Sequence, residues 1–337
     1  MVIVSRRART AWAVAAAVAL IAVAGILVAF DGSDEPKPAA RRSAPPPTTT
    51  TSAAPPTTPT PRPAPVPRGT PVLAIKIDNV ADARPQTGVG SADVVYVEPV
   101  EGGLTRLLAI YAGRPPRVVG PVRSARRTDI QLLAQYGRPV LAYSGAAPEL
   151  LPSLHRAHLV NAPPVRARSA FHRNGARPAP HNMYVRPANL PRGARAPAWP
   201  PLAMGTAPGG GRPTSRQDVG FRAAHYTFTW SAHRHRWLVS LDGRPLISTE
   251  SGRVTAATVV IQRVKLTARE RIEDARGAVS PVAATVGHGR AFVLRDGRRF
   301  TGTWSRPRPR APTRFHTVAG LDLPLARGPA WVLLVPA

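Results

Sequence analysis

The sequence predicts an α/β N-terminal module and a mostly antiparallel β C-terminal module, preceded by a transmembrane helix and a disordered stalk. Three observations support this prediction. An uncharged apolar stretch is followed by a Pro/Thr-rich one. Beyond them, β-branched runs alternate first with helical patterns and then with hairpin turns. We divide the chain into residues 1–9, 10–30, 31–70, 71–185, 186–217 and 218–337.

Residues 10–30 predict a membrane anchor. Arg6, Arg7 and Arg9 precede a stretch that is almost wholly Ala, Val, Leu and Ile, and Asp31 follows it. Roughly 20 apolar residues span the ~30 Å of bilayer hydrocarbon, and the basic flank at 1–9 favours a cytoplasmic N-terminus. A cleaved signal peptide is the alternative, but no small-x-small cleavage pattern ends the stretch. We therefore expect a single-pass cell-membrane protein whose globular part lies outside the cytoplasm.

Residues 31–70 predict a disordered, Pro/Thr-rich linker. Twelve prolines lie between Pro36 and Pro67, interspersed with threonines. Such a stretch buries too little apolar surface to offset its chain entropy, and its prolines favour extended polyproline II structure. We expect it to act as a stalk between the membrane and the globular part.

Residues 71–185 predict an α/β module. Four β-branched runs predict strands, at 72–79, 93–98, 104–111 and 140–143. Ser124 follows the Gly120–Pro121 turn and is a candidate N-cap for a helix that ends at Gly137. Residues 148–157 predict a second helix. Strands mixed with helices are typical of an α/β sandwich.

Residues 218–337 predict antiparallel β structure, after a Pro/Gly-rich linker at 186–217. Alternating aromatic and polar residues from 225 to 231 have the period of a strand. Asp-Gly pairs at 242–243 and 296–297 predict tight hairpin turns. The tryptophans of this module lie in apolar strand patterns, which favours core packing over contact with a glycan: Trp230, Trp237, Trp304 and Trp331.

Several long strings make a family resemblance recognisable. They are IKIDN at 75–79, ARPQTGVGSADVVYVEPVEGGLTRLLAIY at 83–111, GPVRSARRTDI at 120–130, APHNMY at 179–184 and GHGRAFVLRDGRRFTGTW at 287–304. With them, the chain resembles the YerB family of bacterial cell-surface proteins. The resemblance implies two modules of unknown function and a location outside the cytoplasm. Members are typically lipoproteins; this sequence has no cysteine to lipidate, so the apolar stretch would replace the lipid.

The composition bears on the class of partner. The 337 residues contain 46 Lys+Arg, 18 Asp+Glu and no cysteine, and the formal net charge is +28. The missing cysteine excludes disulfide scaffolds, cysteine-ligated metals and thiol nucleophiles. All but three of the cations are arginine, and they occur with abundant Ala, Pro and Gly, as in high-GC coding. No run joins them to interleaved aromatics, so a nucleic-acid partner is not expected despite the charge.

The family strings also supply the candidate binding residues, which are Asp78, Arg84, Arg106, Arg123, Arg126 and His181. Arg123 and Arg126, with the backbone N–H groups near Ser124, predict an anion cradle at a helix start. Its ligand would be a phosphate or carboxylate of a cell-wall polymer. Alternatively, these arginines pair with Asp78, Glu98 and Glu101 and hold strands and turns together.

Two functions follow from these candidates. We predict a non-catalytic protein that binds cell-wall polymer or cell-wall-synthesis partners. The alternative is a cell-wall glycan hydrolase that uses Glu98 and Glu101 as its carboxyl pair. No metal and no cofactor is expected, because the histidines lack metalloprotease spacing and His233 and His235 fall in a predicted hairpin turn.

Overall fold

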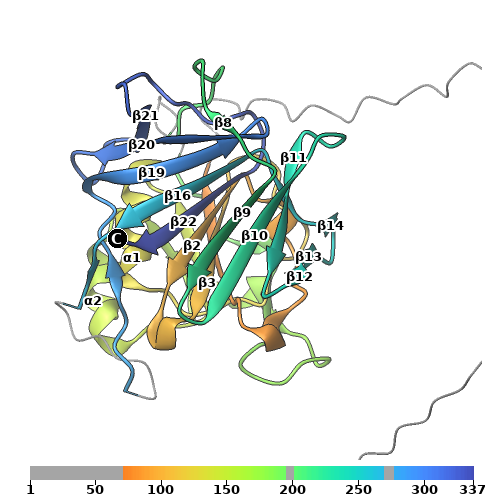
Figure 1. Cartoon of the computed structure of the whole chain (residues 1–337). Coiled ribbons are helices and arrows are strands. Elements are labelled where there is room, and N and C mark those ends of the chain that lie inside the picture. The colour runs from red at the N-terminus through yellow and green to blue at the C-terminus, as the bar shows by residue number, and fades with distance from the viewer. Residues whose placement is uncertain (1–70, 195–200, 269–276) are drawn as a thin grey trace, which may run out of the picture. The chain divides into compact units, whose positions relative to one another are not determined.

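The structure is a computed structural model that describes residues 71–194, 201–268 and 277–337 (Figure 1). The segments predicted as n-region, transmembrane anchor and stalk, at 1–9, 10–30 and 31–70, lie outside the described residues. Within the described ranges, no helix is long and apolar enough to cross a membrane.

The N-terminal part of the chain forms mixed β structure with two short helices. Its strands are β1 (Leu73–Ile77), β2 (Val94–Pro99), β3 (Thr105–Tyr111), β4 (Val140–Ala142), β5 (Val160–Ala162), β6 (Phe171–Arg173) and β7 (Met183–Val185). Its helices are α1 (Arg127–Leu133) and α2 (Leu151–Arg156). Strands β2, β3 and β1 pair antiparallel, whereas β1, β4 and β5 pair parallel. The four predicted strands and both predicted helices are present, and α1 and α2 are shorter than the helices predicted for their segments.

Single-turn 3₁₀ helices connect these elements. They are η1 (Ala81–Ala83), η2 (Val89–Ser91), η3 (Glu101–Gly103), η4 (Ala134–Tyr136), η5 (Pro148–Leu150), η6 (Arg168–Ala170) and η7 (Pro187–Asn189). The cap of α1 differs from the prediction, because Arg126 and not Ser124 occupies the N-cap. The carboxylate of Asp129 accepts the backbone N–H of Arg126 at 2.5 Å, so the helix start is closed from within.

The C-terminal part is mostly antiparallel, as predicted. Its longer strands are β9 (Arg216–Phe221), β10 (Ala224–Ser231), β11 (Arg236–Leu241), β16 (Thr258–Val264), β19 (Gly287–Arg295), β20 (Arg298–Arg306), β21 (Arg314–Thr317) and β22 (Ala330–Pro336). The shorter ones are β8 (Arg212–Pro213), β12 (Arg244–Pro245), β13 (Ile247–Ser248), β14 (Gly252–Arg253), β15 (Thr255–Ala256), β17 (Leu266–Thr267) and β18 (Val282–Ala283).

Both predicted Asp-Gly hairpins are present. Asp242 and Gly243 join β11 to β12 with φ of 52° and 74°. Asp296 and Gly297 join β19 to β20 with φ of 53° and 70°. Two successive positive φ angles match the right-handed twist of the flanking strands, which is why Asp-Gly is favoured there.

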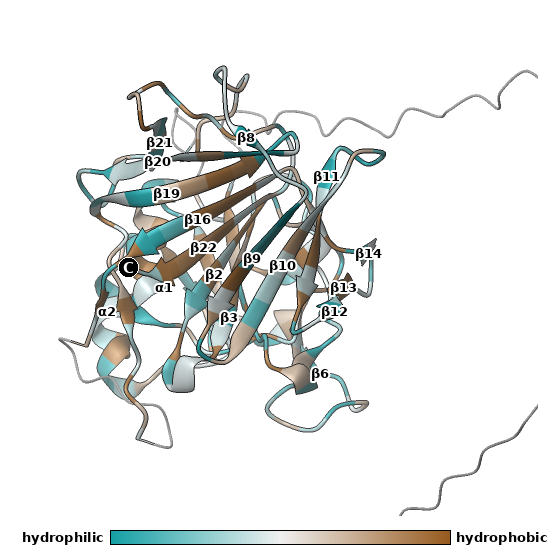
Figure 2. Ribbon diagram, viewed as in Figure 1, coloured by the Kyte–Doolittle hydropathy of each residue, from teal (hydrophilic) through white to brown (hydrophobic). Residues whose placement is uncertain are grey.

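Strand β22 joins the two parts of the chain into one sheet. The strand order of this sheet is β21-β20-β19-β16-β22-β2-β3-β1-β4-β5. Strand β22 therefore pairs in parallel with β16 on one side and with β2 on the other. A strand that is buried on both faces is continuously apolar, and all its residues from Ala330 to Val335 are buried. Figure 2 shows the hydrophobic colour along β22.

The large sheet packs between two different layers. On one face, Ile75 and Val97 share a core with Tyr226 and Phe228 of the smaller sheet, whose order is β12-β11-β10-β9. On the other face, Ala74 and Tyr96 share a core with Leu132 of α1 and Leu154 of α2. Successive strand residues therefore serve opposite cores, as the two-residue period of a strand requires.

The segment at 186–217, predicted as a linker, is described except at 195–200. Its later residues contact C-terminal strands, since Leu202 bridges to Thr313 and β8 pairs with β20. Trp237, Trp304 and Trp331 are buried, which confirms the prediction of core packing for three of the four tryptophans.

Candidate functional site

The family strings converge where β1 ends and β3 begins. Here Lys76 lies in β1, Glu98 in β2 and Asp129 in α1, and all three are wholly buried. The ammonium of Lys76 lies 2.8 Å from Glu98 Oε2 and 2.7 Å from Asp129 Oδ1. We call these three residues the lysine cluster. Two carboxyls share one buried cation, so their charges are not balanced if both are ionised.

Burial disfavours the charged form of Glu98 and the nearby Asp129 carboxylate repels it, so its pKa rises to about 8 despite Lys76. Its second oxygen, Oε1, has no hydrogen-bond partner in the described part of the chain. The raised pKa of Glu98 favours its protonated form and so reduces the repulsion between the two carboxyls that share Lys76.

A second group of charges forms around Glu101, which we call the Glu101 cluster. Arg126 donates from Nε to Oε1 at 2.6 Å and from Nη2 to Oε2 at 2.9 Å, a bidentate pair. Burial opposes ionisation, but the hydrogen bonds and charge of Arg126 win and lower the pKa of Glu101. Arg106 Nη2 lies 3.9 Å from Oε2, and burial together with the Arg126 charge lowers the pKa of Arg106 to about 10.

The third group, the Asp78 cluster, reaches the surface. Asp78 follows β1 and is 1% exposed. His181 donates from Nδ1 to Asp78 Oδ2 at 2.8 Å, and Arg123 Nε lies 3.0 Å from the same oxygen. The side chains of His181 and Arg123 remain 16% and 25% exposed. Because a carboxylate only accepts, it fixes the Nδ1–H tautomer of His181 and leaves Nε2 as the nitrogen available to a ligand.

Asn79 links the Asp78 cluster to the smaller sheet. Its Nδ2 donates to Thr105 Oγ1 at 2.7 Å and to the Tyr226 hydroxyl at 2.6 Å. Its carbonyl accepts from Arg84, whose Nη1 also lies 2.8 Å from Asp242 Oδ2. The turn after β1 is thus held from both sheets, which orients Asp78 next to it.

The structure brings the predicted binding residues together only in part. Asp78, Arg123 and His181 are in direct contact, whereas Arg106 and Arg126 belong to the neighbouring Glu101 cluster and Arg84 pairs with Asp242. The predicted cradle of free N–H groups is wrong. The N–H groups of Arg123, Ala125 and Arg126 are already bonded, to Lys76 O, Gly145 O and Asp129 respectively.

The two glutamates of the hydrolase alternative lie in separate, enclosed ion pairs. The side chains of Glu98 and Glu101 are 1% and 6% exposed. A glycosidase needs both carboxyls beside one accessible glycosidic bond. The geometry therefore gives the hydrolase alternative no support. The expected arginine pairs are present for Asp78 and Glu101, whereas Glu98 pairs with Lys76 instead of an arginine.

Sequence reasoning did not single out Lys76, Asn79, Asp129 or Asp242 as site residues. The sequence does contain a recognisable signal for Lys76 and another for Asp129. Lys76 is a charged residue inside an otherwise apolar run at 72–77, and Asp129 stands three residues after the N-cap, where a capping-box acid belongs. Nothing in the spacing connects Asn79 to Tyr226, because their contact joins two sheets.

The surface cavities of the described ranges do not coincide with the three clusters. Cavities of about 630 Å³ and 700 Å³ are lined by residues from 166–191 and from 308–312, outside the three clusters. Among residues 71–194, 201–268 and 277–337, no group of three or more His, Asp or Glu is placed to hold a metal ion.

Fold and site define the class: a two-sheet protein with helices on the outer face of its larger sheet, organised around buried ion pairs. The chain belongs to the DUF3048 family, a family of unknown function. Residues 57–199 match "Protein of unknown function (DUF3048) N-terminal domain", and residues 217–332 match the corresponding C-terminal domain.

Two relatives agree with this assignment. A protein of Bacillus subtilis (strain 168) named "Putative lipoprotein YerB" is 45% identical over 60 residues, which is 18% of each chain. The crystal structure of the YerB protein from Bacillus subtilis matches with a TM-score of 0.68 and 22% identity, over 80% of this chain and 92% of that chain. The second match shows a shared fold, and the resemblance to the YerB family is confirmed.

Proposed function

We propose that this protein is a membrane-anchored, extracytoplasmic envelope protein that binds anionic cell-wall polymer without catalysing a reaction. The observation that carries the proposal is the Asp78 cluster. One buried carboxylate holds an imidazole and a guanidinium at the surface. The guanidinium of Arg123 attracts an anion, and because both side chains are already held in place, binding costs little conformational entropy.

The location rests on the first thirty residues and on the relative. Residues 10–30 are uncharged and apolar behind a basic flank. The relative from Bacillus subtilis is named as a lipoprotein, and an apolar helix would perform here the anchoring that its name implies there. Residues 71–337 hold 38 Lys+Arg and 15 Asp+Glu, and this excess attracts anionic envelope material.

The test uses the full chain, purified in detergent, and cell-wall sacculi with and without their anionic polymer. We expect retention on polymer-bearing sacculi at about 0.15 M salt, where weak non-specific attraction is screened. Arg123→Gln removes a charge-assisted hydrogen bond and should weaken retention roughly tenfold. The matched control is Arg114→Gln, an exposed arginine without an ion pair in the described residues, and it should bind as the parent does.

Three outcomes would overturn the proposal. Equal retention on polymer-free sacculi would point to a protein or glycan partner. If Arg123→Gln and Arg114→Gln weakened retention equally, the net charge of the protein and not the Asp78 cluster would account for binding. Release of soluble sugars, abolished by Glu98→Gln, would establish the hydrolase.

A further inference from the structure

One stretch of the chain carries arginines that no acid neutralises. The sequence contains no Asp or Glu between Glu149 and Asp218. The stretch is described at 150–194 and at 201–217, and in the second part Arg216 pairs with Asp218. The first part, 150–194, contains seven arginines: Arg156, Arg166, Arg168, Arg173, Arg177, Arg186 and Arg192. None of the seven forms an ion pair within the described residues. Their charge is therefore available to an external anion.

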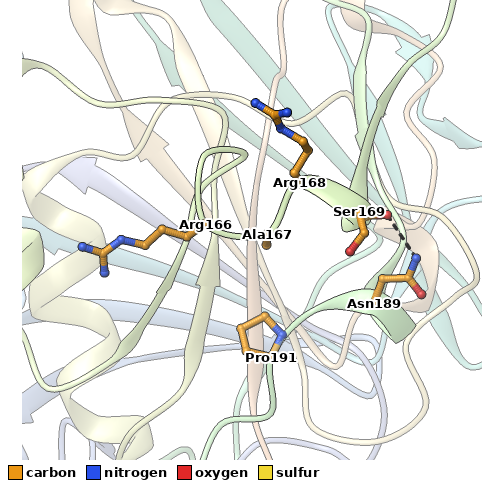
Figure 3. A pocket seen from close by; sticks show the side chains of 6 residues that line it. All are labelled: Arg166, Ala167, Arg168, Ser169, Asn189 and Pro191. Atoms are coloured by element: carbon orange, nitrogen blue, oxygen red, sulfur yellow. Dashed lines mark hydrogen bonds between the residues drawn. The ribbon is translucent and has the colours of Figure 1, made fainter.

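Two of these arginines line the cavity of about 630 Å³. Arg166 and Arg168 stand on either side of Ala167, which is 8% exposed, and their guanidinium groups point in different directions (Figure 3). Asn189 Nδ2 donates to the Ser169 carbonyl at 3.1 Å. This bond ties η6 to η7, so the segment that carries Arg168 is held in place.

The diverging guanidinium groups indicate what kind of anion fits. One small anion cannot contact both, whereas successive anionic groups along a chain can. The cavity is lined by Arg, Ala, Ser, Asn and Pro, so it offers no aromatic ring on which a base or a sugar would stack. Recognition there depends on charge and on the hydrogen-bonding fork of arginine, which matches the paired oxygens of a phosphate.

We infer that the seven arginines of residues 150–194, a set that does not include His181 of the Asp78 cluster, form a binding surface for a linear polymer of repeated phosphodiester groups without bases. We call it the arginine surface. The inference rests on the proposed function and deepens it, because it names the polymer chemistry and adds a surface distinct from the Asp78 cluster. Arg166 and Arg168 contact different phosphates of the chain, and Ser169 and Asn189 supply neutral polar groups to the same cavity.

The experiment measures binding of the full chain to long-chain poly(glycerol phosphate) as a function of salt. The variant is Arg166→Ala/Arg168→Ala. We expect roughly tenfold weaker binding, and a slope of log K against log salt that falls by about 0.7 per arginine removed. The control Arg244→Ala/Arg290→Ala removes two exposed arginines from β12 and β19 and should bind as the parent does. Arg166→Lys/Arg168→Lys keeps the charge but loses the fork, so it should bind between the two.

Other probes decide the ligand class. Glycerol phosphate monomer should bind far more weakly than the polymer, and an equal affinity would overturn an extended surface. Poly-L-glutamate or oligothymidylate binding as tightly as poly(glycerol phosphate) would overturn the assignment to a base-free phosphodiester. If Arg166→Ala/Arg168→Ala and Arg244→Ala/Arg290→Ala lost the same affinity, net charge alone would explain binding, and the inference would be overturned.

The same measurements separate this inference from the proposed function. If Arg166→Ala/Arg168→Ala weakens binding and Arg123→Gln does not, the arginine surface stands and the Asp78 cluster fails as the binding site. If only Arg123→Gln weakens binding, the arginine surface fails and the proposed function stands.

Discussion

The ion-pair clusters at the end of β1 and the arginine surface at 150–194 use cations in opposite ways. In the lysine and Glu101 clusters, Lys76 and Arg126 are buried and each contacts a carboxylate within 2.8 Å. On the arginine surface, seven arginines have no acidic partner in the described residues. The first region balances its charge inside the protein, whereas the second presents its charge to solvent.

This difference separates stability from binding. A buried cation is tolerated only when carboxylates replace its lost hydration, so removing one partner leaves an uncompensated charge. An exposed cation retains its water and contributes little to folding. Substitutions in the clusters should therefore act on the free energy of unfolding, and substitutions on the arginine surface should act on ligand affinity.

Lys76→Met should show the largest effect on stability. It removes the cation that two buried carboxyls share, and we expect a loss of about 3–5 kcal/mol in the free energy of unfolding. Chemical denaturation of the full chain measures it. The control is Lys265→Met, an exposed lysine, which should change stability by less than about 0.5 kcal/mol. Similar losses of stability for Lys76→Met and Lys265→Met would show that buried, paired cations and exposed cations contribute alike to folding.

Glu98→Gln should change how stability depends on pH. The folded-state pKa of Glu98 is raised from 4.5 to about 8, so the folded protein holds a proton that the unfolded chain releases. Stability from this group is complete below pH 4.5 and is lost as pH rises towards 8, an effect on the order of a few kcal/mol. Unfolding at several pH values should show this decline in the parent and a flatter profile in Glu98→Gln.

The matched control for that profile is Glu149→Gln, which alters an exposed carboxyl and should leave the decline in place. A parent protein whose stability rises between pH 5 and 8, with Glu98→Gln unchanged, would show that Glu98 is ionised in the folded state.

Asn79→Ala should cost about 1–3 kcal/mol, because it leaves the buried hydroxyls of Thr105 and Tyr226 without their donor. Tyr226→Phe removes one of these hydroxyls and keeps the ring, so its cost should be nearer 1 kcal/mol. Thermal unfolding of both variants tests whether the turn after β1 depends on its link to the smaller sheet. The reverse order of costs would show that the ring's surroundings dominate.

Arg166→Ala/Arg168→Ala should have the smallest effect on folding, within about 0.5 kcal/mol of the parent. Both residues are exposed, and the guanidinium of Arg166 lies 3.4 Å from His155 Nε2 and forms no ion pair in the described residues. Chemical denaturation in the absence of ligand checks this. A loss comparable to that of Lys76→Met would show that the arginine surface is part of the fold's own charge balance.

Local patterns predicted the elements of this fold well. The Asp242–Gly243 turn was predictable because two residues set its geometry. The run at 331–335 is continuously apolar, as in a strand buried on both faces, but its position in the sheet could not be predicted from that pattern. Its pairing with β2 joins residues more than 200 positions apart, such as Val94 and Ala330, and its pairing with β16 joins residues about 70 apart, such as Thr258 and Ala330. No local period encodes either pairing.

For the site, the sequence predicted some of the residues but not their contacts. The family strings identified Asp78, Arg123 and His181, which the structure does place in contact. They did not show that Arg126 would donate from Nε and Nη2 to Glu101, nor that Asp129 would close the helix start. Those outcomes depend on how β2 and α1 pack over the end of the sheet, and packing across elements is what a linear pattern lacks.

The place of β22 also determines when this protein can fold. Residues 330–336 complete the middle of the larger sheet, so β2 and β16 each keep one edge unpaired until the last part of the chain emerges. Open strand edges recruit other chains and promote aggregation. A protein exported through a membrane would thus need its N-terminal strands shielded during passage, and a polypeptide interrupted before residue 330 would be a substrate for quality-control proteases rather than a shorter working version.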